Sequence, residues 1–88
     1  SMKTEEKQRC QSCGMPLGPG WYGTENTGKE SHTYCTYCYK DGEFTQPDLT
    51  LDGMIAKSVG HMTARLQMPL AQAETLARDV IPKLKRWT

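Results

Sequence analysis

Two identical pairs of cysteines are the residues of this chain that can do chemistry. Cys10 and Cys13 enclose two residues, and Cys35 and Cys38 repeat that spacing after an interval of 21 residues. A CxxC pair on a tight turn aims both sulfurs at one point, and two such pairs face to face supply the four thiolates of a tetrahedral Zn²⁺ centre. The interval slightly exceeds the commonest one, but a longer loop costs little once the metal closes it. The sequence therefore predicts one structural zinc ion bound by all four cysteines.

Other uses of cysteine fit the sequence less well. Disulfide bonds would require an oxidising compartment, and residues 1–9 contain no apolar run of the kind that forms a secretory signal. A redox CxxC lies between a strand and a helix of a βαβ unit and needs no second copy. His32 stands three residues before Cys35, but four thiolates already saturate tetrahedral zinc, so we expect a loop histidine there. These comparisons favour a reduced, cytoplasmic protein that binds zinc.

The length and charge of the chain exclude several classes of protein. Its 88 residues suffice for one domain with a small core, in which a bound metal adds useful stability. Its apolar stretches are only a few residues long, so we expect no membrane-spanning segment. The formal charge is +1, and binding one Zn²⁺ with four thiolates changes it to about −1. The folded protein is therefore near neutral and not broadly basic.

The same residues argue against an enzyme. A catalytic zinc keeps one coordination position open for water or substrate, whereas four cysteines close the shell. The sequence also lacks a GxSxG turn, a phosphate-binding glycine loop and an HExxH pair. We therefore expect a protein without catalytic activity of its own.

Composition divides the chain into three regions within one domain. Residues 1–9 are polar and without periodicity, which predicts a flexible N-terminus. Residues 10–47 are rich in glycine, proline, threonine and aromatic residues, a composition typical of short strands and turns around a metal. Within this region, Asn26 to Gly28 predicts a turn between the two cysteine pairs. Residues 48–88 have helical periodicity and predict a two-helix tail packed on the metal-binding region.

The periodicity of residues 48–88 predicts two antiparallel helices. Thr50 or Asp48 caps the first helix, whose apolar face consists of residues three and four apart: Leu51, Met54, Ile55, Val59, Met62 and Leu66. The second helix begins at Pro69, which a first turn tolerates, and its apolar face consists of Ala73, Leu76, Ala77, Val80 and Ile81. Pro82 ends or kinks this helix. A further short helical turn is then expected to dock Trp87 on the core.

Longer strings of residues resemble one family. They are Cys10-Gln-Ser-Cys-Gly-Met-Pro-Leu17, Tyr34-Cys-Thr-Tyr-Cys-Tyr-Lys-Asp-Gly-Glu-Phe44, Pro47-Asp-Leu-Thr-Leu51 and Leu84-Lys-Arg-Trp87. Their combination resembles the zinc-ribbon family of small, mostly bacterial proteins, and it covers nearly the whole chain. The resemblance implies a zinc ribbon at residues 10–47 fused to a helical tail, with the four cysteines at the family's metal positions. It implies no reaction, because no activity is assigned to the family.

Periodicity and resemblance together predict the fold class. We expect a small α+β protein in which a zinc ribbon of short strands and knuckles is followed by a C-terminal helical hairpin. The ribbon would use the metal as its core, and the helices would bury their apolar faces against each other.

Two groups of residues are candidates for an interaction surface. Trp21 and Tyr22 lie among glycines and could stack on a peptide or on bases, although aromatic residues also dominate cores. Lys83, Lys85 and Arg86 form a small basic end, which at a helix C-terminus also interacts favourably with the macrodipole. The first hypothesis is a structural-zinc module that contacts a protein partner or a second copy of itself. The alternative is a nucleic-acid-binding ribbon acting in transcription or its regulation, and a thiol or zinc sensor is the third.

The distribution of charge makes nucleic acid the less favoured partner. Residues 1–47 carry five bases and six acids, a net charge of −1 to which the zinc site adds about −2. The three clustered bases near the C-terminus are too few to neutralise the roughly 6 to 10 phosphates of a strong DNA contact. We therefore expect weak or no binding of random-sequence nucleic acid at physiological salt.

Overall fold

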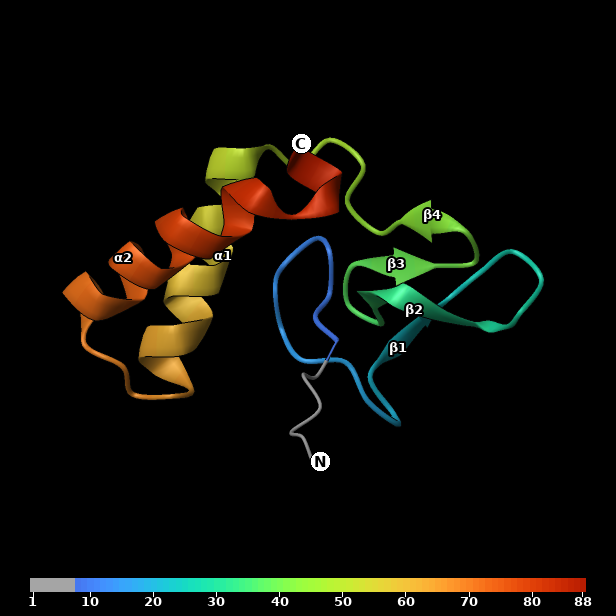
Figure 1. Cartoon of the computed structure of the whole chain (residues 1–88), viewed down its shortest axis with the longest axis horizontal. Coiled ribbons are helices and arrows are strands. Elements are labelled where there is room, and N and C mark those ends of the chain that lie inside the picture. The colour runs from blue at the N-terminus through green and yellow to red at the C-terminus, as the bar shows by residue number, and fades with distance from the viewer. Residues whose placement is uncertain (1–7) are drawn as a thin grey trace, which may run out of the picture. The chain divides into compact units, whose positions relative to one another are not determined.

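The structure is a computed structural model that describes residues 8–88, and within them it has four short strands, two α-helices and two 3₁₀ helices. The strands precede the helices along the chain (Figure 1), which confirms the small α+β fold class. Residues 1–7 of the predicted flexible N-terminus lie outside the described residues. In the described part of the chain, no helix has the length and apolar character needed to cross a membrane.

The chain folds as two compact units. Among the described residues, the first comprises residues 8–10 together with Met15–Thr45. The second comprises Gln11–Gly14 together with Gln46–Thr88. The second unit therefore contains the turn of the first cysteine pair as well as the helices.

The first unit is a ribbon of two antiparallel strand pairs. Strand β1 (Tyr22–Thr24) pairs with β2 (Glu30–Cys35), with an irregular register between Tyr22 and Gly23. Strand β3 (Tyr39–Lys40) pairs with β4 (Glu43–Phe44). The predicted turn between β1 and β2 is present: Gly28 has a φ of 87° and its N–H donates to the carbonyl of Glu25 at 2.9 Å.

Gly23 allows the strands of the ribbon to approach one another closely. A Cβ at this position would lie 2.5 Å from the carbonyl oxygen of Tyr39 and 2.9 Å from that of Cys35. Only glycine fits, because both neighbours are backbone atoms that cannot rotate away. The N–H of Gly42 also donates to the carbonyl of Thr24 at 2.9 Å, which ties the β3–β4 turn to β1.

An aromatic cluster packs the ribbon. The rings of Tyr34, Tyr39 and Phe44 lie against one another, with centroids 4.9 to 5.4 Å apart and tilted or edge-on orientations. Such tilted and edge-on pairs are the favoured geometries of aromatic rings. Tyr34 of β2 and Tyr39 of β3 therefore both lie on the packed side of the ribbon.

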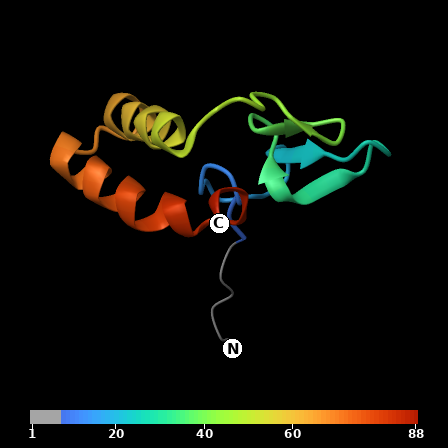
Figure 2. The ribbon, with the colours of Figure 1, turned by 90° about the horizontal axis from the view of Figure 1, so that it is seen from above.

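The second unit is built on a helical hairpin. Helices α1 (Leu51–Ala64) and α2 (Leu70–Val80) lie side by side in both views (Figures 1 and 2). Its buried residues are Met54 and Ile55 of α1, Ala73 and Ala77 of α2, and Ile81 and Leu84 of the segment that follows. Thr50 caps α1 as predicted, because its hydroxyl accepts the N–H of Gly53 at 3.0 Å. Pro69 directly precedes α2.

Two leucines expected on the apolar faces are exposed instead. Leu66 is 60% exposed because α1 ends at Ala64, and Gln67 with a φ of 56° then turns the chain out of the helix. Leu76 is 43% exposed because the contact face of α2 is narrow and centred on Ala73 and Ala77, which are four residues apart. The two small alanines are fully covered, so the periodicity predicted a wider face than the hairpin uses.

Beyond α2 the chain continues in 3₁₀ turns. The first is η1 (Ile81–Lys83), which contains Pro82, and the second is η2 (Lys85–Trp87). Proline lacks the N–H that an α-helix needs at this position, so the change to a tighter turn is expected there. The indole Nε1 of Trp87 donates to the carbonyl of Ser12 at 2.8 Å, so the terminal turn docks within the second unit.

Candidate metal centre

The first cysteine pair lies in a tight hairpin turn, which we call the first knuckle (Cys10–Cys13). The N–H of Cys10 donates to the carbonyl of Met15 at 2.8 Å, and Arg9 and Pro16 form an antiparallel bridge just outside it. Gly14 has a φ of 84°, which is the conformation expected from a glycine directly after the second thiol. This positive φ reverses the chain, so that Cys10 and Cys13 lie on the same turn.

The second cysteine pair forms the connection between β2 and β3, which we call the second knuckle (Cys35–Cys38). Cys35 is the last residue of β2, and the N–H of Cys38 donates to its carbonyl at 3.1 Å. The residues with positive φ come later, at Asp41 (53°) and Gly42 (82°), where they form the β3–β4 turn. The two knuckles are therefore not structural copies, as the different residues after their second thiols predict.

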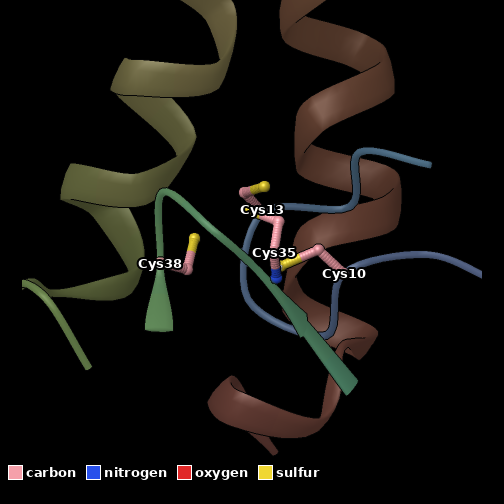
Figure 3. A group of neighbouring side chains, drawn as sticks. All are labelled: Cys10, Cys13, Cys35 and Cys38. Atoms are coloured by element: carbon pink, nitrogen blue, oxygen red, sulfur yellow. The ribbon is translucent and has the colours of Figure 1, made fainter. Parts of the chain in front are cut away.

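The two knuckles bring all four cysteines together, as Figure 3 shows. The four sulfur atoms lie within 4.8 Å of one another, and Cys10, Cys35 and Cys38 are buried while Cys13 is half-buried. Tetrahedral Zn²⁺ with Zn–S bonds of about 2.3 Å requires sulfurs about 3.8 Å apart. The four sulfurs therefore need to move only slightly closer together to reach the geometry of a zinc site. The structure therefore confirms a site that can hold one zinc ion.

A backbone amide stabilises negative charge on one sulfur of the four-cysteine group. The N–H of Cys35 donates to the sulfur of Cys10 at 3.2 Å, and Figure 3 shows that nitrogen beside the sulfur. An N–H directed at a thiolate stabilises its negative charge and fixes its orientation toward a metal. The donor set of four sulfurs and this amide contact both fit zinc.

His32 lies outside the four-cysteine group. Its ring stacks on Tyr22 with centroids 4.3 Å apart and planes 22° apart, and its Nε2 lies 3.7 Å from Oε1 of Glu30. The expectation of a loop histidine is wrong in one respect, because His32 belongs to strand β2, but its side chain is exposed as a surface histidine would be.

The aromatic residues predicted as an interaction surface have different environments. Trp21 is 45% exposed and its partner is Tyr37, with ring centroids 5.9 Å apart. Tyr22 is half-buried against His32. Sequence reasoning missed Tyr37, because it lies 16 positions beyond Trp21 and only the fold shows that the two rings meet.

The basic residues near the C-terminus also differ from one another. Lys83 is exposed, with its Nζ 3.4 Å from Oδ1 of Asp79, and Lys85 is exposed. Arg86 is half-buried, and its guanidinium donates to the hydroxyl of Ser12 at 3.0 Å and to the carbonyl of Gln46 at 2.7 Å. The sequence carried no signal for these contacts, since Ser12 and Arg86 are 74 residues apart.

Comparison with known proteins identifies a family to which the chain belongs. The sequence profile of a family described as "Putative zinc ribbon domain" matches residues 9–88 of the chain. The match includes all four cysteines and extends through both helices to the last residue. No curated protein and no solved structure matches the chain.

Proposed function

We propose that this chain, which belongs to the zinc-ribbon family, acts without catalysis as a structural-zinc module that presents an exposed aromatic surface to a partner protein. The zinc would serve the fold, because a complete shell of four thiolates leaves no position for water or substrate. The observation that carries the proposal is the pair formed by Trp21 and Tyr37, which we call the aromatic surface.

The aromatic surface carries the most exposed large rings of the described ribbon. Trp21 is 45% exposed and Tyr37 is 67% exposed, whereas the rings of Tyr34, Tyr39 and Phe44 pack against one another. Trp and Tyr are enriched among the residues that dominate binding energy at protein interfaces. Two adjoining exposed rings in a small ribbon therefore favour a binding role.

Zinc would hold the aromatic surface in place. Tyr37 lies inside the second knuckle, between two metal ligands, and its carbonyl accepts the hydroxyl of Thr45 at 2.6 Å. The N–H of the neighbouring Thr36 donates to the carbonyl of Trp21 at 2.8 Å, which joins the segments that carry the two rings. A metal that fixes the knuckle would thus reduce the entropy lost by these rings when a partner binds.

Charge supports a protein as the partner. The ribbon half of the chain has a net charge of −1, and the zinc site adds about −2, so it repels phosphate. Of the three clustered bases, Arg86 directs its guanidinium to Ser12 and Gln46. Nucleic-acid binding and zinc or thiol sensing remain the alternatives that the experiment below separates.

Affinity purification with the zinc-loaded full chain tests the proposal. We expect a specific protein from the source cells to bind wild-type chain, and the purified partner to bind Trp21→Ala and Tyr37→Ala at least about 30-fold more weakly, the effect of a typical hot-spot residue. Leu70→Ala is the matched control, because Leu70 is an exposed apolar residue of α2, which belongs to the second unit, whereas Trp21 and Tyr37 belong to the first. Undiminished binding by both aromatic variants would contradict the proposal.

Three further measurements distinguish the alternatives. If sedimentation shows that wild-type chain dimerises and Trp21→Ala does not, the partner is a second copy of this chain. Submicromolar affinity for random-sequence DNA or RNA, with a steep dependence on salt, would overturn the proposal in favour of nucleic acid. Partner binding only after oxidation or zinc removal would favour a sensor.

A further inference from the structure

The C-terminal turn η2 (Lys85–Trp87), which we call the clasp, makes four hydrogen bonds to the two residues between the ligands of the first knuckle. The backbone N–H of Lys85 donates to Oε1 of Gln11, and that of Arg86 donates to the carbonyl of Gln11, both at 3.0 Å. Nη1 of Arg86 donates to the hydroxyl of Ser12 at 3.0 Å, and Nε1 of Trp87 donates to its carbonyl at 2.8 Å. The clasp therefore contacts the main chain of this turn at two consecutive residues.

The contacts made at Ser12 are buried. Ser12 is 0% exposed, so its hydroxyl and carbonyl depend on protein partners rather than on bulk water. A buried polar group that loses its partner is costly, which makes these contacts energetically important. Gln11 and Ser12 connect Cys10 to Cys13, so their backbone dihedrals determine where the two thiols point.

The clasp is itself held in position. Nη2 of Arg86 donates to the carbonyl of Gln46 at 2.7 Å, and the guanidinium lies over the Trp87 ring, 4.6 Å from its centroid. The buried Leu84 joins the clasp to η1, and its carbonyl accepts the N–H of Trp87 at 3.0 Å. A guanidinium with several fixed partners is preorganised and loses little entropy on making each contact.

We infer that the clasp is a positioning element of the zinc site, in which Arg86 and Trp87 hold the Gln11–Ser12 turn in the conformation that directs its cysteines to the metal. Groups that hold metal ligands in place typically change metal affinity by about 10- to 100-fold when they are removed. Zinc binding and docking of the C-terminus are then coupled, and the coupling is reciprocal. This inference depends on the zinc site and not on the aromatic surface, so either can fail without the other.

Zinc affinity measured by competition with a chromophoric chelator, in reducing buffer and with the full chain, tests the inference. Arg86→Ala and Trp87→Phe should each weaken zinc binding by about 10- to 100-fold. Trp87→Phe is the milder variant, because it keeps an aromatic ring and removes only the Nε1 donor. Lys83→Ala is the matched basic control that keeps wild-type affinity, since Lys83 precedes the clasp and its exposed side chain lies beside Asp79.

A double-mutant cycle separates positioning from general stability. If Arg86 acts through Ser12, adding Ser12→Ala to Arg86→Ala should cause little further loss of zinc affinity, whereas unconnected effects would add. Circular dichroism of each zinc-saturated variant checks that α1 and α2 are intact. Wild-type affinity in both Arg86→Ala and Trp87→Phe, or strict additivity in the cycle, would overturn the inference.

Discussion

Replacing Gly23 by alanine should destabilise the ribbon through a collision with backbone atoms. The added Cβ would lie 2.5 Å from the carbonyl oxygen of Tyr39, 2.9 Å from that of Cys35 and 3.0 Å from that of Tyr34. Carbon and carbonyl oxygen approach one another no closer than about 3.3 Å even in favourable contacts, so β1 must move by close to 1 Å. No side-chain rotation relieves the collision, because all three oxygens belong to the main chain.

Gly23→Ala should lower the free energy of unfolding by about 3 kcal/mol, the upper end of the range for overpacked sites. For a domain of this size, a loss of that magnitude lowers Tm by at least about 10 °C. Zinc affinity should fall as well, because two of the crowded carbonyl groups belong to the second knuckle or adjoin it. Cys35 is the last residue of β2, and Tyr39, the first residue of β3, directly follows Cys38. A movement of β1 therefore acts on both sides of the second knuckle.

Thermal unfolding of the zinc-loaded chain, followed by circular dichroism, measures this effect. Gly18→Ala is the matched control: among residues 8–88, nothing beyond the chain neighbours of Gly18 lies within 4 Å of a Cβ built there. We expect Gly18→Ala to melt close to the wild type. If Gly23→Ala melts at the same temperature as Gly18→Ala, the steric reasoning about the packing of β1 against β2 and β3 is refuted.

Three further predictions concern the metal and the first helix. Elemental analysis under reducing conditions should find one zinc per chain. The Cys35→Ala variant should lose this zinc and its ribbon should unfold, because structural zinc contributes apparent binding free energies of about 10 to 16 kcal/mol. Undiminished zinc affinity in this variant would refute the assignment. Gly60→Ala should raise the free energy of unfolding by about 1 kcal/mol, since Gly60 is inside α1 and an added Cβ would point into open space. Gly53→Ala gains less, because its Cβ would meet the Leu49 side chain at 2.8 Å. Thr50→Ala should cost about 1 kcal/mol by removing the α1 cap, and a chemical denaturation series comparing it with Thr50→Ser, which keeps the hydroxyl, checks this.

The amino-acid sequence by itself determined which four cysteines form the candidate metal site and the order of the elements. The four cysteines could be identified because two residues between thiols fix a tight turn whatever the rest of the chain does. The start of α1 could be identified for a similar reason, since Thr50 bonds to an N–H only three residues away. The positive φ of Gly14 and the turn at Gly28 are equally local, because each depends on the conformational freedom of a single residue.

Only the tertiary structure decided which side chains are available to a partner. Trp21 meets Tyr37 because of strand register, and Arg86 meets Ser12 because the C-terminal turn docks on the first knuckle. Leu66 and Leu76 have the periodicity of buried residues but are exposed, because α1 ends early and α2 contacts its neighbour through two alanines. Periodicity reports which residues share a face, but burial depends on what covers that face, and contacts between residues far apart in the chain carry no local signal.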